Sequence, residues 1–524
     1  MSRRESLLRG AAALAVAGLI IKISNLLVRV PLAHLVGSEG LGMYQMALPA
    51  FFAFFHVASG GVPVAVQNLV AEAFARDRPR MAQQVFRLAF VYTLLAGGLG
   101  SAALLAGAPR IARMLGEPRV QWSLMALSPA VILFALDSLY RNYLQGRNLM
   151  TPSATGSVLE QAAKVVVTMG ASSLLMRWGK EFGAAGAALG ITAGAVLSLL
   201  YVAAYTHWMS RRDPADDRPG ESAAVLARRM AVMAWPVTLG SIAVPLLNLV
   251  DVGIVQRGFQ KAFADQSLAT AMYGAYSGIA LQVVWFPQVL TNALGNALAP
   301  VLAAARARND RALVRERIVL GIRATGLICL PAAVGLALLA DPVARVFGEP
   351  GAAVPLRFLA PVAYLGPLFW MMTAQLQALG QTGIPMRNFG LSMGAKLLLD
   401  ALAAPVPGFA VEGVALATVA MFLTGCWLNA RALARQLDEP LPWALLLEGP
   451  LISSLLMGAV LFGLATAGLM PSATWASLST ALAVAPVAYG VLLVITRAVT
   501  WADLREMGGP WGTRLERWFH SFWN

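Results

Sequence analysis

The chain has 524 residues, of which 58% are hydrophobic and 13% are charged. Soluble proteins carry about 25% charged residues, so this composition excludes an ordinary soluble enzyme or binding module. The formal net charge of +14 would suit a nucleic-acid partner, but the placement of the cations along the chain has a better explanation, given below. We therefore predict an all-α integral membrane protein.

Fourteen apolar runs are long enough to be transmembrane helices, since about 20 apolar residues cross a bilayer. The first run begins after SRRESLLRG, which resembles a secretory signal, but we interpret it as a retained helix because thirteen further runs follow. The predicted limits of the helices are 10–35, 43–71, 84–107, 121–146, 153–177, 183–208, 228–256, 268–303, 313–340, 352–379, 386–405, 410–433, 443–468 and 474–499.

The first run carries a polar stripe. Residues seven apart in a helix point almost the same way, so Lys22 and Arg29 share one face, with Asn25 between them. A cation near the bilayer centre costs on the order of 2.5–3.5 kcal/mol, so such residues usually face a bundle interior or an aqueous cavity. We interpret the stripe as a binding surface for an anionic headgroup, since Arg and Lys bind phosphate oxygens. Snorkelling of Arg29 to the membrane surface is the alternative.

The second run contains a histidine and several glycines. His56 precedes the cluster Gly60–Pro63, which can bend or break the helix. This histidine is either a third contact to phosphate or a buried, hydrogen-bonded side chain. Before it, Gly40 and Gly42 allow a tight turn between the first two helices, and a weaker echo of this segment, ATAMYGAY, begins at Ala269.

Among the ionisable residues within the predicted spans, six are further candidates for pairing or ion coupling: Asp137, Glu160, Lys164, Asp251, Lys396 and Asp400. Glu160 and Lys164 are four residues apart, which allows an ion pair along one helix face, and Lys396 and Asp400 have the same spacing. A contact of these groups with the headgroup is the alternative. Asp137 and Asp251 show no partner on their own helices, so we expect each to pair with the basic stripe or to bind a coupling cation.

Two segments about 232 residues apart resemble each other. PRIARMLGEPRVQWSLMALSP, from Pro109, aligns with DPVARVFGEPGAAVPLRFLAP, from Asp341. The repeat holds six spans, an even number, so both copies enter the membrane in the same orientation. The predicted organisation, in chain order, is an N-lobe (1–209), a cytoplasmic linker (210–225), a pseudo-symmetric C-lobe (226–435), two added helices (436–500) and an amphipathic tail on the inner leaflet (501–524).

The distribution of cations predicts the topology. With a cytoplasmic N-terminus, about three times as many Lys and Arg residues lie on the cytoplasmic side as outside, as the positive-inside rule requires. We therefore expect a multi-pass protein of the bacterial cytoplasmic membrane with both termini in the cytoplasm. Its surroundings are the lipid bilayer, and no nucleic acid is expected as a partner. The oligomeric state is left open.

Motifs of enzymes are absent from the sequence. It has no G-x-x-x-x-G-K-[ST] loop for ATP and no H-E-x-x-H metal motif. Cys329 and Cys426 stand alone in apolar runs, so neither a disulfide nor a zinc site is expected. We predict a protein that is not an enzyme and has no cofactor. The energy source is left open, with coupling to an ion gradient or to the membrane potential as the candidates.

Several stretches resemble one family. VRVPLAHLVGSEGLGMYQMALP, GGVPVAVQNLVAEAFARD and LYRNYLQGRNLMTPSATGSVLEQAAKVVV are similar to the stage V sporulation protein B group of polysaccharide flippases. That group is close to the lipid II flippases of the multidrug/oligosaccharidyl-lipid/polysaccharide superfamily. The resemblance covers essentially the whole chain, and NALGNALAPVLAAAR, from Asn292, extends it into the second half.

The resemblance implies fourteen helices in two six-helix lobes with a two-helix appendix. It also implies transfer of an undecaprenyl-pyrophosphate-linked saccharide from the inner to the outer leaflet by alternating access. In the lipid II flippases, cations on spans 1, 2 and 8 face the central cavity. Lys22 and Arg29 fit the first span, and His56 fits the second approximately. Span 8 (268–303) has no basic residue. This difference from the lipid II flippases favours a related lipid-linked sugar as the substrate, or a differently arranged site.

Two other functions remain as alternatives. A cation-coupled multidrug exporter of the same superfamily would need acidic residues in its cavity, such as Asp137 or Asp251. A non-transporting membrane scaffold for envelope or spore assembly would have no polar cavity between the repeats.

Overall fold

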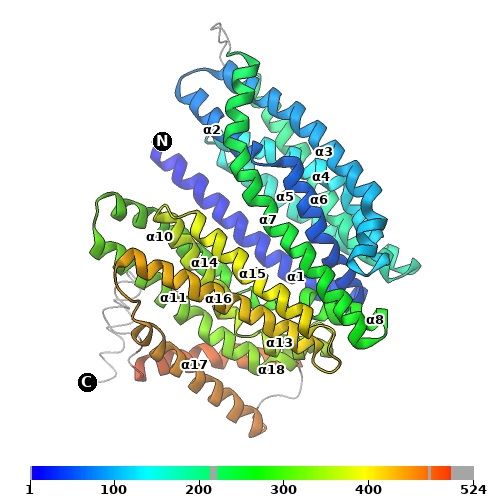
Figure 1. Ribbon diagram of the computed structural model, residues 1–524, viewed down its shortest axis with the longest axis vertical. Helices are drawn as coiled ribbons and strands as arrows, with labels where there is room; N and C mark the ends of the chain where they lie inside the picture. Colours follow the sequence, from blue (N-terminus) through cyan, green and yellow to red (C-terminus); the bar gives the residue numbers. More distant parts are fainter. Residues whose placement is uncertain (1–2, 213–220, 470–473, 497, 499–524) are drawn as a thin grey trace. The chain divides into compact units, whose positions relative to one another are not determined.

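The computed structural model describes residues 3–212, 221–469, 474–496 and 498. Within these ranges, the side chains of 3–23, 25–27 and 445 are not described. All regular elements in the described part of the chain are helices, as the sequence predicts (Figure 1). The predicted tail, 501–524, and the middle of the predicted linker, 213–220, lie outside the described residues.

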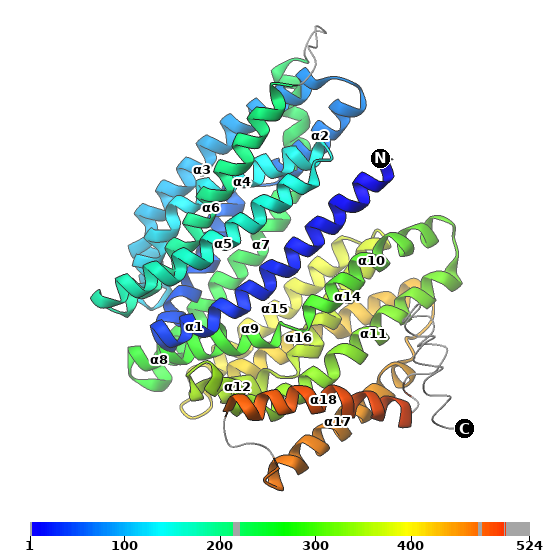
Figure 2. The same cartoon turned by 180° about the vertical axis from the view of Figure 1, so that it is seen from behind.

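The chain divides into two compact units. The first contains the chain up to Ile279 together with Phe347–Glu349 and Asp400–Val411, and the second contains the rest. The helices of the first unit are α1 (Arg3–Ser59), α2 (Val62–Ala75), α3 (Pro79–Leu115), α4 (Gln121–Gly146), α5 (Met150–Leu175), α6 (Lys180–Ser210), α7 (Ala223–Phe263) and α8 (Gln266–Tyr273). Helices α3, α4 and α6 pack side by side in this unit, and α5 lies against both α6 and α1 (Figures 1 and 2).

Helix α1 is broken at Gly37. This residue has φ 69° and ψ 177°, a backbone conformation that only glycine adopts without strain. The two halves of α1 correspond to the first predicted span and most of the second. The tight turn expected at Gly40 and Gly42 is wrong, because the chain is helical again from Ser38. The break expected after His56 is confirmed, since α1 ends at Ser59, Gly60 has a φ of +54°, and α2 begins at Val62.

A row of glycines on α6 holds that helix tightly against α5. Gly186, Gly190 and Gly194 are four residues apart and so share one face of α6. A Cβ atom at each would come within 2.8 Å of a backbone atom of α5. Small residues at this spacing let membrane helices approach closely, and van der Waals packing then drives their association. This contact fixes the segment of α5 that carries Glu160 and Lys164.

The second unit is also helical. Its elements are α9 (Leu281–Val284), α10 (Gln288–Ala307), α11 (Arg311–Leu338), α12 (Ala340–Val346), α13 (Ala353–Leu359), α14 (Val362–Ala378), α15 (Gly383–Ala403), α16 (Ala410–Leu437), α17 (Trp443–Thr466) and α18 (Thr474–Ile495). Helix α15 belongs to this unit only up to Leu399, and α16 only from Glu412 onwards. Helix α11 is central in this unit because it packs against α10, α14 and α17, and α17 in turn packs against α18 (Figure 2).

Ten helices in the described residues are long and apolar enough to cross a membrane. The count rises to eleven if the bent pair Pro350–Leu359 and Val362–Ala378, which meet at 46°, forms one span. The predicted number of fourteen is not confirmed by this count. One reason is that α1 and α2 are counted together as a single stretch, Val28–Ala75, despite their breaks.

We expect Gly190→Ala to destabilise the protein by about 1–3 kcal/mol, because overpacking a close contact forces backbone shifts. The added methyl group would lie 2.0 Å from Thr168 Oγ1 and 2.8 Å from the Lys164 carbonyl oxygen. Thermal unfolding of the purified protein in detergent measures the change. Gly170→Ala is the matched control, since Gly170 is on α5 and has nothing within 4 Å of an added Cβ. Equal unfolding midpoints for the two variants would contradict the close contact of α5 with α6.

Candidate functional site

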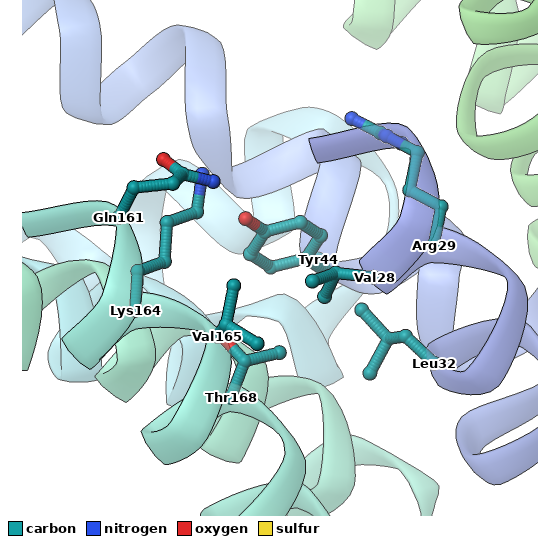
Figure 3. A pocket seen from close by; sticks show the side chains of 8 residues that line it. All are labelled: Val28, Arg29, Leu32, Tyr44, Gln161, Lys164, Val165 and Thr168. Carbon is teal, nitrogen blue, oxygen red and sulfur yellow. The ribbon is translucent and has the colours of Figure 1, made fainter. Parts of the chain in front are cut away.

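Arg29 and Lys164 line one small pocket in the first unit. The pocket has a volume of about 30 Å³ and is lined by α1 and α5 through Val28, Arg29, Leu32, Tyr44, Gln161, Lys164, Val165 and Thr168. Figure 3 shows that the ends of Gln161 and Lys164 point towards the hydroxyl group of Tyr44, while Arg29 extends from the α1 side. A cavity of this size holds about one water molecule. We call it the basic pocket.

The guanidinium group of Arg29 is held by a neutral acceptor. Its Nη1 donates a hydrogen bond of 2.9 Å to the carbonyl oxygen of Gly278, in the π-helical segment Gly274–Ala280 that follows α8. None of the eight residues lining the pocket is acidic. Arg29 and Lys164 line the same pocket, and Glu160 is one turn before Lys164 on α5. The pocket therefore carries excess positive charge.

The other residues of the predicted basic stripe are placed differently. Lys22 and Asn25 belong to α1, but their side chains lie outside the described part of the structure. His56 is half-buried in the last turn of α1, beside the ring of Phe55 at 4.9 Å. The break at Gly37 separates it from Arg29, and it does not line the basic pocket.

Asp137 belongs to a buried ionic network, which corrects the expectation that it has no partner on its own helix. Arg141 Nε, one turn along α4, lies 2.6 Å from Asp137 Oδ2. Arg141 also pairs with Glu160 of α5 and donates a 2.7 Å hydrogen bond to Ser198 Oγ of α6. Ser198 Oγ in turn donates to Asp137 Oδ1 at 2.5 Å. The carboxylate of Glu160 is thus bound by Arg141 as well as being near Lys164.

The remaining predicted residues lie on later helices. Asp251 is half-buried on α7. Lys396 and Asp400 are on α15, and they are 4% and 0% exposed. None of the three lines the basic pocket.

A second polar cluster joins the ends of several helices of the first unit. Its centre is Glu117, which is 0% exposed and forms two 2.9 Å hydrogen bonds with Arg119. Arg119 Nη1 also donates to Glu39 Oε1 at 2.6 Å, and Lys180 Nζ donates to Glu39 Oε2 at 2.9 Å. Two carboxylates and two cations therefore neutralise each other at this end of α1, α4 and α6.

Glutamates from both copies of the sequence repeat take part in these contacts. Glu117 accepts a 2.6 Å hydrogen bond from the hydroxyl group of Thr270, at the start of α8. Glu349, the repeat partner of Glu117, accepts a 2.6 Å hydrogen bond from the backbone N–H of Ser38. Ser38 and Thr270 are themselves repeat partners, because both pairs differ by 232 in residue number. Each glutamate therefore binds the helix start that belongs to the other copy of the repeat.

The same pairing continues along α1 and α8. A Cβ atom on Gly42 would lie 2.4 Å from the carbonyl oxygen of Thr270, and one on its repeat partner Gly274 would lie 1.8 Å from that of Ser38. One turn further, Gln45 Nε2 donates to the carbonyl oxygen of Ser277, again 232 residues away. Of the two glycines expected to form a turn, Gly42 is instead in close contact with the segment around Gly274, while Gly40 lies against Val36.

Sequence reasoning missed Arg141, Arg119 and Lys180, and it did not join Lys164 to Arg29. The signal for Arg141 is its spacing, because it lies four residues after Asp137 on the same helix. The Gly-Glu-Pro motif at Glu117 and Glu349 was a visible signal, because a glutamate repeated in an apolar chain needs a partner in both copies.

Comparison with known proteins gives consistent matches. Residues 7–306 match the sequence model of the family described as polysaccharide biosynthesis protein. The chain is 28% identical to stage V sporulation protein B of Bacillus subtilis (strain 168) over 516 residues, which is 96% of this chain and 98% of the relative.

Two solved structures share the fold. The lipid II flippase MurJ in an inward closed conformation matches with a TM-score of 0.66 and 15% identity, over 94% of this chain and 99% of that one. An inward-facing multidrug resistance MATE family transporter of the MOP superfamily matches with a TM-score of 0.67 and 14% identity, over 81% and 98%. The chain therefore has the helical fold of these membrane transporters.

We expect Glu117→Gln to lower the free energy of unfolding by about 1.5–3 kcal/mol, because hydrogen bonds to charged groups contribute that much. The matched control is Glu439→Gln, whose carboxylate pairs with Arg315 at 3.1 Å with both side chains more than half exposed. An exposed pair contributes about 0–1 kcal/mol. Thermal unfolding in detergent compares the two variants, and the same loss in both would show that the buried cluster adds no stability.

Proposed function

Because the chain belongs to the family of polysaccharide biosynthesis proteins, we propose that it is a lipid-linked saccharide flippase. It moves a saccharide on undecaprenyl pyrophosphate, such as lipid II or a related cell-wall, capsule or spore precursor, from the inner to the outer leaflet. The similarity to a sporulation protein along nearly the whole chain and the fold shared with a lipid II flippase support this function.

The observation that carries the proposal is the basic pocket. Arg29 and Lys164 come from two different helices, and no carboxylate lines the space between them. A cation within a membrane helix is costly, so such a residue is a candidate for a functional site. Neither the saccharide nor the diphosphate of the substrate can enter hydrocarbon, and the diphosphate is the part that a basic site attracts.

Arg29 is held in a way that permits exchange. Its present partner, the carbonyl oxygen of Gly278, is neutral. Phosphate oxygens form charge-assisted hydrogen bonds with arginine, which are about twice as strong as neutral ones and can be bidentate. In our proposal, Arg29 exchanges the carbonyl for phosphate when the pocket widens, and Lys164 binds the same group as a point charge.

In our proposal, the contacts of Glu117 with Thr270 and of Glu349 with Ser38 keep one side of the transporter closed during the alternating-access cycle. With a cytoplasmic N-terminus, Glu117, Glu349 and the starts of α8 and of the second half of α1 lie at the outer face. Opening to that face separates the two copies of the repeat, so both glutamate contacts must break. The two contacts involve the same motif in both copies of the repeat, and we propose that they open together.

We further propose fourteen membrane-crossing helices with both termini in the cytoplasm of a bacterium. Dividing α1 at Gly37 adds one span to the eleven apolar candidates. The broken stretch from α8 to α10 adds another, and α15, whose interior charges exclude it from an apolar count, adds the last. The two lobes and the two added C-terminal helices then follow the sequence repeat.

The membrane potential is the proposed driving force. The diphosphate headgroup is negative, and the cytoplasm is negative relative to the outside, so outward movement of the headgroup is favourable. Each charge that crosses contributes about 2.3 kcal/mol per 100 mV. An ion gradient is the alternative source of energy, with Asp251 as a candidate ligand for the coupling cation.

The cation-coupled exporter is the weaker candidate. Its cavity would need an available carboxylate, but Asp137 is bound by Arg141 and Ser198. The likeness to a multidrug transporter extends to the fold alone, at 14% identity. A scaffold without transport would have no use for two cations on one pocket.

We expect Arg29→Gln combined with Lys164→Gln to slow translocation at least tenfold in vesicles, since each lost charge-assisted bond is worth about 1.5–3 kcal/mol. The measurement follows the transfer of a fluorescent undecaprenyl-pyrophosphate saccharide between leaflets. Lys261→Gln is the control, because Lys261 is exposed at the end of α7 and does not line the pocket. Lys22→Gln is tested separately. Wild-type rates in the folded double variant would refute the assigned site.

A further inference from the structure

A second, larger pocket lies in the first unit, away from the basic pocket. Its volume is about 320 Å³, within the range of sites for small ligands. It is formed where the beginning of α3 meets the ends of α4 and α6, and its lining residues are Gln83, Phe86, Arg87, Tyr140, Tyr143, Ala203, Thr206, His207, Ser210 and Arg211. None of these residues was assigned a function by the sequence or by the comparisons.

The mouth of this pocket is basic. Arg87, His207 and Arg211 are exposed there, and no acidic residue is among the ten that line it. Within the described part of the chain, the side chains of Arg87 and Arg211 have no hydrogen bond or ion pair. Two guanidinium groups from different helices are therefore available to an anion at one opening.

The inner part of the pocket is aromatic. The ring of Phe86 lies 4.9 Å from that of Tyr140 and 4.8 Å from that of Tyr143. Tyr143 is 1% exposed, so the cluster is firmly packed and not a loose surface. The packed aromatic rings give the pocket a firm floor, so a bound group is held at its basic mouth.

The position of the pocket is at the surface of the membrane. Arg87 is two turns into α3, which begins at Pro79, and Arg211 follows the last residue of α6. Both helices are candidates to cross the bilayer. In the proposed topology these ends face the cytoplasm, where anionic lipids attract cations. Basic pockets between membrane helices on that side bind phosphate-bearing headgroups.

We propose that this pocket binds the phosphate headgroup of an anionic membrane phospholipid, such as phosphatidylglycerol. Arg87 and Arg211 bind the phosphate oxygens, and the acyl chains remain in the surrounding bilayer beside α3 and α6. This site is distinct from the basic pocket of Arg29 and Lys164. Phospholipid binding here therefore does not depend on which substrate the protein transports.

The test measures lipid binding by native mass spectrometry of the full chain in detergent, with phosphatidylglycerol and phosphatidylcholine as probes. Because each cation near a membrane contributes about fivefold to anion binding, we expect Arg87→Gln with Arg211→Gln to weaken phosphatidylglycerol binding about thirtyfold. Phosphatidylcholine binding should not change. Arg87→Lys with Arg211→Lys keeps the charges and should keep most of the binding.

The control is Arg228→Gln with Arg308→Gln, which removes the same charge from exposed positions that do not line the pocket. Equal phosphatidylglycerol binding by the test and control variants would overturn the proposal. Displacement of the lipid by inorganic phosphate would assign the site to a free anion, and stronger competition by undecaprenyl phosphate would assign it to the transported lipid. Either result would also overturn it. Translocation is recorded in parallel, and a loss of lipid binding with normal translocation would support the proposal and separate the two sites.

Discussion

The structure depends on a carboxylate that is completely removed from solvent. Glu117 is 0% exposed, and a buried charge is tolerated only when it is paired and hydrogen-bonded. Its pairing with Arg119 and Thr270 ties the start of α4 to the start of α8. Glu349, in the second copy of the motif, is half-buried and accepts a hydrogen bond from the backbone N–H of Ser38, at the start of the second half of α1. The helix break at Gly37 is part of this arrangement, since the N–H of Ser38 begins a new helical segment there.

Close packing without large side chains completes the framework of the first unit. Lipid is as apolar as leucine, so membrane helices associate through tight backbone contact more than through hydrophobic burial. Gly186, Gly190 and Gly194 provide such contact between α6 and α5, and Gly42 and Gly274 provide it between α1 and the end of α8. The Cβ of Lys164 lies against Gly194 of α6, while its side chain lines the pocket shared with α1. The basic pocket is therefore a consequence of helix packing in this unit.

The cations of the first unit fall into three groups by availability. Arg119 and Arg141 are held by carboxylates, so their charge is already used in the fold. Arg29 is bound to a backbone carbonyl, and its charge remains uncompensated at the basic pocket. Arg87 and Arg211 are exposed at a pocket mouth. We expect phosphate to bind least to Arg119 and Arg141, more to Arg29, and most readily to Arg87 and Arg211, because a cation that is already paired gains little from an additional anion.

The sequence by itself determined the membrane class, the helical composition and the repeat, because these follow from local hydrophobicity and from similarity along the chain. It also predicted the helix break after His56. Only the tertiary structure decided which charges meet: Arg141 pairs with Glu160 across 19 positions, and Lys164 joins Arg29 through the rotation of α5 about its axis. A glycine such as Gly42 is equally suited to a turn and to close helix contact. The local sequence cannot distinguish a turn from a close helix contact at Gly42, because the contact is made by the carbonyl oxygen of Thr270, more than 200 residues away.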